Sequence, residues 1–185
     1  MANSSIQIFL ETVRILKIEM TMSKNINIEL LVPDQIDNVL SLSQRLNIDS
    51  IPCSYWGLDS DRVSELIDRP NRTRVALKKN VLVGIGTVSQ GNLYQRHLAE
   101  ISVAVCPNYR QQGIAKMLIS ALEDDAKAIG VEMIKALIWT ENLPSKQLFE
   151  SLGYEHRTTL YAEFKSQDFG EMDSCVYYKR LAYRG

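Results

Sequence analysis

Six consecutive residues, Arg110-Gln111-Gln112-Gly113-Ile114-Ala115, carry the clearest chemical signal in the sequence. They follow an apolar run that ends at Val105 and a loop marked by Pro107, and they lead directly into a helical pattern. The first backbone N–H groups of a helix have no partner inside it, and the helix dipole adds about half a unit of positive charge there. Gly113 has no Cβ and lets a ligand approach the backbone closely. This arrangement predicts a site that holds phosphate.

The residues after Gly113 predict the helix that such a site needs. Apolar side chains recur at three- and four-residue spacing, which gives one apolar face, and Gly130 occupies the position expected of a C-cap. An ordinary strand-to-helix turn with an arginine at its mouth would also explain the pattern. The six residues by themselves leave both interpretations open.

Two segments together carry a family resemblance. Residues 110–115 resemble motif A of the GCN5-related N-acetyltransferases (GNAT), Q/R-x-x-G-x-G/A, and fit it at each fixed position. Residues 99–110, AEISVAVCPNYR, are similar to the strand that precedes this motif in the family. Residues 142–154, NLPSKQLFESLGY, resemble motif B, an Asn followed by a short helix and a Gly-aromatic pair. The resemblance extends over residues 26–182.

The resemblance implies an α/β fold with a mixed, mostly antiparallel, twisted sheet of about six to seven strands and helices on both faces. In this fold the fourth and fifth strands diverge into a V-shaped cleft, here between residues 101–105 and 134–139. The residue pattern agrees with that order. It predicts strands at 26–32, 73–78, 81–90, 98–105, 133–139, 154–164 and 175–181, helices at 34–46, 60–69, 114–129 and from Pro144, a tight hairpin at 79–80 and a polar turn at 165–173.

By the same resemblance, the chain transfers acetyl from acetyl-CoA, its cosubstrate, to a primary amine of a small molecule or protein. Arg110 adds a side-chain contact to the pyrophosphate or is a solvated loop residue. Asn142 contacts the CoA arm, caps the helix that begins near Pro144, or does both. Two sets of backbone groups are implied to bind acetyl-CoA: those of Gln111, Gln112, Gly113, Ile114 and Ala115 hold the pyrophosphate, and those of Val103, Ala104 and Val105 bond the pantetheine amides as a missing strand would.

Glu100 is the first candidate for the base that must deprotonate the amine, because the resemblance aligns it with a catalytic Glu of some family members. The alternative is an outward-facing strand carboxylate without a catalytic task. The family's usual proton donor to the thiolate is a Tyr, and here Phe149 occupies that position. The remaining candidates for this acid are Tyr154, Tyr161, Ser145 or a water molecule.

The acceptor is not determined by the sequence. A polyamine, an aminoglycoside-like compound, an amino acid, or an N-terminus or lysine of a protein are all compatible with the motifs. Because Phe149 replaces the usual Tyr, a second hypothesis is a CoA-binding regulatory or interaction module with little turnover.

Composition excludes several other classes. A net charge of −1 and a pI near 6.1 do not indicate binding to nucleic acid or an anionic membrane. Three separated cysteines and two histidines predict neither a disulfide framework nor a metal site, and indicate a cytoplasmic setting. Residues 1–21 are expected to be an N-terminal extension, either an amphipathic helix or poorly ordered, ahead of one domain over 22–185. This extension could support a homodimer.

Overall fold

One sheet of seven strands organises the part of the chain that the computed structural model describes, residues 26–46, 54–55, 58–67, 71–166 and 169–182. The strand order is β1-β2-β3-β4-β5-β7-β6, and each neighbouring pair is antiparallel except β4 and β5. The expected extension over residues 1–21 lies outside the described residues. The strands are β1 Ile26–Leu30, β2 Asn71–Lys78, β3 Val81–Gln90, β4 Leu98–Val105, β5 Met133–Trp139, β6 Glu155–Ser166 and β7 Gly170–Arg180.

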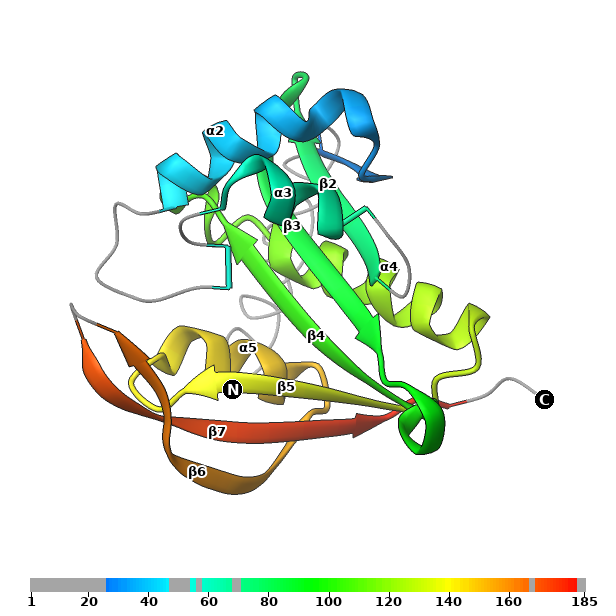
Figure 1. Cartoon of the computed structure of the whole chain (residues 1–185), viewed down its shortest axis with the longest axis vertical. Coiled ribbons are helices and arrows are strands. Elements are labelled where there is room, and N and C mark those ends of the chain that lie inside the picture. Colours follow the sequence, from blue (N-terminus) through cyan, green and yellow to red (C-terminus); the bar gives the residue numbers. More distant parts are fainter. Residues whose placement is uncertain (1–25, 47–53, 56–57, 68–70, 167–168, 183–185) are drawn as a thin grey trace, which may run out of the picture.

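Helices cover both faces of the sheet, as the resemblance implied (Figure 1). On one face, α2 and α3 pack over a cluster that includes Leu42, Val63 and Ile85. On the other face, α4 and α5 pack over a cluster that includes Leu122 and Phe149. The helices are α2 Ile36–Leu46, α3 Ser60–Glu65, α4 Ile114–Ala128 and α5 Leu143–Ser151, with short 3-10 turns η1 Pro33–Gln35, η2 Leu93–Gln95 and η3 Pro107–Tyr109.

Most element boundaries fall within two residues of the prediction, and two do not. The helix expected at 60–69 ends at Glu65. The polar turn expected at 165–173 is largely strand, because β6 continues to Ser166 and β7 already begins at Gly170. The polar composition of this segment predicted a turn, but pairing between the two strands stabilises strand structure there. Lys165 lies opposite Glu171 and forms a 3.0 Å ion pair with it.

The two central strands form a fork (Figure 1). β4 and β5 pair in parallel only at Leu98↔Met133, Ala99↔Ile134 and Glu100↔Lys135. Beyond these residues no described strand is paired to the free edge of β4, while β5 continues to pair with β7 on its other side. The expected divergence of the fourth and fifth strands is therefore present, with Glu100 and Lys135 at its closed end.

Helix α4 lies close against β3 on the side of the sheet away from α2. A Cβ on Gly86 would lie 2.8 Å from Leu122 Cδ1, so even an alanine at this position would force the end of the Leu122 side chain to move. Arg74 of β2 donates two hydrogen bonds of 2.7 Å to Asp125 of α4. These contacts hold the second half of α4 against β2 and β3.

Among the described helices, none combines the length and apolar character needed to cross a membrane.

Candidate active site

The loop between β4 and α4 presents open backbone. Gly113 is the N-cap of α4 with φ +76°, in the left-handed region that favours glycine, and its cap has no side-chain hydrogen bond. A Cβ on Gly113 would meet nothing within 4 Å. The first intrahelical bond runs from Met117 N to Gly113 O, so the N–H groups before Met117 have no partner within the helix. Open space in front of unpaired donors fits a pyrophosphate.

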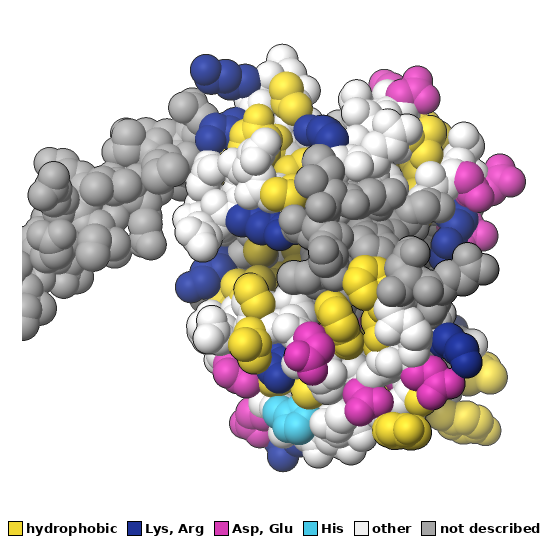
Figure 2. All heavy atoms as spheres, turned by 90° about the vertical axis from the view of Figure 1, so that its left-hand side faces the viewer, with side chains coloured by type: hydrophobic (Ala, Val, Ile, Leu, Met, Phe, Trp, Pro, Cys, Tyr) yellow, Lys and Arg dark blue, Asp and Glu magenta, His cyan; other side chains and the backbone are white. Residues whose placement is uncertain are grey.

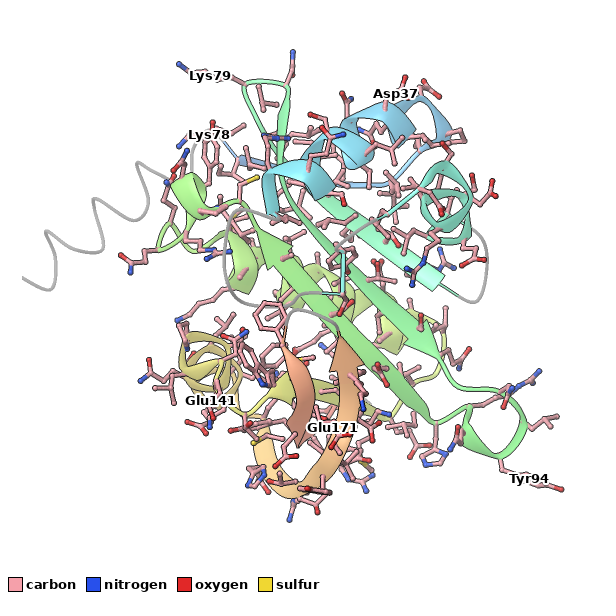
Figure 3. The ribbon with its side chains drawn as sticks, turned by 60° about the vertical axis from the view of Figure 1, so that its left-hand side comes forward. Asp37, Lys78, Lys79, Tyr94, Glu141 and Glu171 are labelled. Atoms are coloured by element: carbon pink, nitrogen blue, oxygen red, sulfur yellow. The ribbon has the colours of Figure 1, made fainter. Side chains whose placement is uncertain are left out.

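A lysine that the sequence did not suggest anchors this loop. Lys78, at the end of β2, donates a 2.8 Å hydrogen bond to Gln112 Oε1, and its ammonium lies 5.4 Å from the centre of the Tyr109 ring. Figure 3 shows Lys78 beside the short helical turn that precedes α4. The sequence feature that could have indicated this role is the position of Lys78 directly before the hairpin turn at 79–80. In the structure, Cys106 N bonds Val83 O, and this bond holds the hairpin against the loop.

Positive side chains gather on the same side. At the upper left of Figure 2, where Figure 3 places Lys78 and Lys79, several Lys and Arg side chains are visible without an Asp or Glu among them. A local excess of positive charge favours an anionic ligand even though the whole chain has a net charge of −1.

Arg110 folds back onto β4. Its Nε donates a 3.0 Å hydrogen bond to the carbonyl oxygen of Val105. The guanidinium therefore lies between the β4–α4 loop and the open edge of β4. Arg110 is nevertheless an exposed residue, and its contact with the pyrophosphate stays a prediction.

The hydrogen-bond direction of β4 shows which backbone groups face the fork. Gly91 N bonds Leu98 O and Cys106 N bonds Val83 O, so residues of even number in β4 face β3. The peptide groups of Val103 and Val105 then face the fork, together with Ile101, which the sequence analysis did not single out. Ala104 faces β3, so its backbone is not available to a ligand in the fork.

Glu100 lies at the closed end of the fork. Its carboxylate is 2.8 Å from Lys135 Nζ, and 48% of its side chain and 26% of that of Lys135 are exposed. Both line a pocket of about 370 Å³. Ser102, two residues along the same strand, accepts or donates a 2.8 Å hydrogen bond with the buried Tyr55 hydroxyl. Glu100 is therefore reachable from solvent on the face that carries α2 and α3.

Tyr154 occupies a different environment. Its ring is buried and packs edge-to-face on Phe149 at 4.9 Å, and its hydroxyl donates a 3.0 Å bond to Glu123 of α4. Burial, followed by the charge of Glu123, raises the pKa of Tyr154. The structure places this phenol in a buried network with Glu123.

Asn142 and Ser145 meet at the start of α5. Asn142 is the N-cap, and its Oδ1 accepts a 3.2 Å hydrogen bond from Ser145 N, with Pro144 in the first turn. The capping interpretation of Asn142 is thus confirmed, and it leaves the amide nitrogen of that side chain available. Ser145 is half-buried and follows the open end of β5.

Cys106 directly follows β4 and is buried. Burial raises the pKa of the Cys106 thiol, so the residue next to the loop stays protonated near neutral pH. Within the described ranges, no three His, Cys, Asp or Glu side chains gather in a way that could hold a metal ion.

Comparison with known proteins agrees with this geometry. The model of the acetyltransferase (GNAT) family matches residues 40–154. A segment of 59 residues, 32% of this chain, is 37% identical to the L-amino acid N-acyltransferase MnaT of Escherichia coli (strain K12), and it spans only 34% of that relative.

Solved structures share the fold over most of the chain. The structure of an N-acetyltransferase from Staphylococcus aureus Mu50 superposes with a TM-score of 0.75 at 20% identity, covering 86% of this chain and 100% of that one. The yncA protein of Salmonella typhimurium, solved with its cofactor acetyl-CoA, gives a TM-score of 0.74 at 19% identity, covering 88% and 97%.

Proposed function

Because the chain belongs to the GNAT acetyltransferase family, we propose that it transfers the acetyl group of acetyl-CoA to a primary amine, with Glu100 as the base. The observation that carries the proposal is a single strand, β4, whose free edge joins two chemical groups. At one end lies the open backbone around Gly113, and at the other lies the Glu100 carboxylate.

The dimensions of β4 support this assignment. Val105 lies five positions after Glu100, which is about 16 Å along an extended strand. A pantetheine arm that starts at the loop and adds to the free edge through Val105, Val103 and Ile101 ends near Glu100. Arg110, which bonds Val105 O, is at the point where such an arm enters.

Acetyl-CoA, when bound, supplies an acetyl thioester, and the residues of this chain handle protons and charge. Glu100 accepts a proton from the incoming ammonium, because only the neutral amine is nucleophilic. The amine nitrogen then bonds the acetyl carbon as the carbon–sulfur bond breaks. N–H groups of β4 that face the fork are donors for negative charge on the acetyl oxygen.

The departing thiolate needs only a weak acid, since thiols have a pKa of about 8.5. It takes up the proton that the acetylated nitrogen loses, either through water or through Ser145. Tyr154 is left out of this step because its hydroxyl already donates to Glu123.

Calorimetric titration with acetyl-CoA, combined with a thiol-release screen over an amine panel, tests the proposal. We expect the Glu100→Gln variant to bind acetyl-CoA like wild type and to lose about 10²- to 10⁴-fold in kcat/KM. An unchanged kcat/KM in that variant would remove Glu100 from the mechanism.

The alternative hypothesis, a CoA-binding regulatory or interaction module, predicts a different result in the same experiment. A wild-type protein that binds acetyl-CoA but releases no thiol with any amine would be a CoA-binding module, as the replacement of the usual Tyr by Phe149 allows. A folded protein that does not bind acetyl-CoA would contradict both functions.

A further inference from the structure

The pocket beside Glu100 has a composition that is informative about the acceptor. It lies on the face of α2 and α3, between the β3–β4 hairpin and the closed end of the fork. Hydroxyls and amides dominate its side chains, and Glu100 and Lys135 are the charged groups in its lining. The polar lining residues are Thr87, Ser89, Gln90, Gln95 and Ser102.

This lining disfavours several acceptor classes. An apolar amine would be covered by only three apolar side chains, Leu98, Ala99 and Ile101, because the other side chains of the lining are polar or charged. A polyamine would bring further ammonium groups, but the carboxylate in the lining, Glu100, already faces Lys135 at 2.8 Å. A volume of about 370 Å³ is at the lower end of small-ligand sites, which suits a small polar molecule.

The ion pair itself is complementary to a zwitterion. Glu100 and Lys135 lie directly opposite each other in the last register pair of the fork, and both side chains are partly exposed to the pocket. A molecule whose ammonium and carboxylate are joined through one carbon can face both ends of this pair at once. Its nitrogen then lies at Glu100, and its carboxylate forms a charge-assisted bond with Lys135.

We propose that this pocket is the acceptor site and that it selects small α-amino acids or closely similar zwitterions, with Lys135 binding the acceptor carboxylate. The inference rests on the proposed function, since it specifies the amine that Glu100 deprotonates. Lys135 is then a specificity-determining residue of the site.

Matched substrate pairs test the proposal. Thiol release is measured with a small amino acid and with its decarboxylated amine, such as serine against ethanolamine and alanine against ethylamine. Wild-type protein is expected to favour the amino acid by about 10- to 100-fold in kcat/KM, which corresponds to one charged hydrogen bond. The Lys135→Met variant is expected to lose this preference, because its KM rises more for the amino acid than for the decarboxylated amine.

Two further variants complete the design. Lys135→Arg keeps the positive charge and is expected to retain the preference. Lys165→Met removes a lysine that is also ion-paired across neighbouring strands but does not line the pocket, and it is expected to behave like wild type.

The overturning results are separate from those for the proposed function. Equal kcat/KM for amino acids and their decarboxylated amines in wild type would refute the zwitterion assignment while leaving the acetyltransferase intact. An equal loss of kcat for both substrates in Lys135→Met would likewise refute it and make Lys135 a residue that only positions Glu100. Turnover with no amine at all would overturn the proposed function and this inference together.

Discussion

Tyr154 has the chemistry of a general acid but is surrounded by groups that hold its proton in place. Its hydroxyl donates to Glu123, which also accepts two 2.8 Å bonds from Lys179. A buried phenol beside a carboxylate resists ionisation, so it is a poor source of protons for a thiolate. Glu100 differs because its carboxylate is half exposed and faces a pocket.

Replacing Tyr154 by Phe therefore separates a structural role from a catalytic one. We expect the free energy of unfolding to fall by about 1–3 kcal/mol, since a buried hydrogen bond to a charged group is lost. We expect kcat to stay within about twofold of wild type, because the phenol is not used in the reaction. Urea unfolding and steady-state kinetics measure the two effects, and a kcat reduced by 100-fold or more in a well-folded variant would restore Tyr154 as the acid.

At the scale of elements, α4 begins and ends with glycines in the same conformation. Gly113 precedes the helix with φ +76° and Gly130 follows it with φ +83°, and a Cβ on either would meet nothing within 4 Å. The two glycines thus share a backbone conformation and open surroundings. Only Gly113 lies beside the N–H groups at the helix start, which are donors for an anion.

This symmetry provides a controlled test. Gly113→Ala and Gly130→Ala are each expected to cost about 1–2 kcal/mol of stability, because both place an alanine in the left-handed region. Only Gly113→Ala is expected to weaken acetyl-CoA binding, by about 10-fold or more, since its methyl group occupies the space in front of the helix start. Calorimetry on both variants decides the point, and equal affinities would argue that acetyl-CoA does not approach Gly113.

The free edge of β4 makes a second prediction about an element. Bound acetyl-CoA is expected to slow amide exchange at Val103, whose N–H faces the fork. The amide of Ala104 faces β3 and should exchange slowly with or without ligand. Residue-resolved exchange by NMR measures both, and an unchanged Val103 amide in the saturated protein would contradict strand addition at this edge.

Local signals predicted the elements well, and long-range pairing supplied what they lacked. The motif around Gly113, the hairpin turn at Lys79-Asn80 and the cap at Asn142 depend on neighbouring residues, so the sequence alone revealed them. The contacts from Lys78 to Gln112 and from Glu100 to Lys135 span 34 and 35 positions and depend on strand register. Register also decided that Ala104 faces β3, which no local pattern indicates.

At the scale of the whole molecule, α4 connects the two parts of the sheet that meet at the fork, β1–β4 on one side and β5–β7 on the other. β4 and β5 share only three register pairs, so the sheet is weakly joined at its centre. Arg74 on β2 binds Asp125, while Lys179 on β7 binds Glu123, two residues earlier on the same helix. The proposed active site has β4 with Glu100 on one side of the fork and Lys135 of β5 on the other, so its geometry depends on these two attachments.

Substitutions at the Lys179–Glu123 ion pair can distinguish two costs of losing it: leaving a buried charge without a partner, and losing the packing of the lysine side chain. Lys179→Met leaves the buried Glu123 carboxylate without its cation, and we expect it to lower the free energy of unfolding by about 3 kcal/mol. Adding Glu123→Gln in the same chain removes that charge, keeps an acceptor for the Tyr154 hydroxyl, and is expected to recover more than half of the loss. Urea unfolding of wild type, the single and the double variant measures this recovery. If the double variant were no more stable than Lys179→Met, the packing of the Lys179 side chain, rather than its charge, would hold α4 against β7.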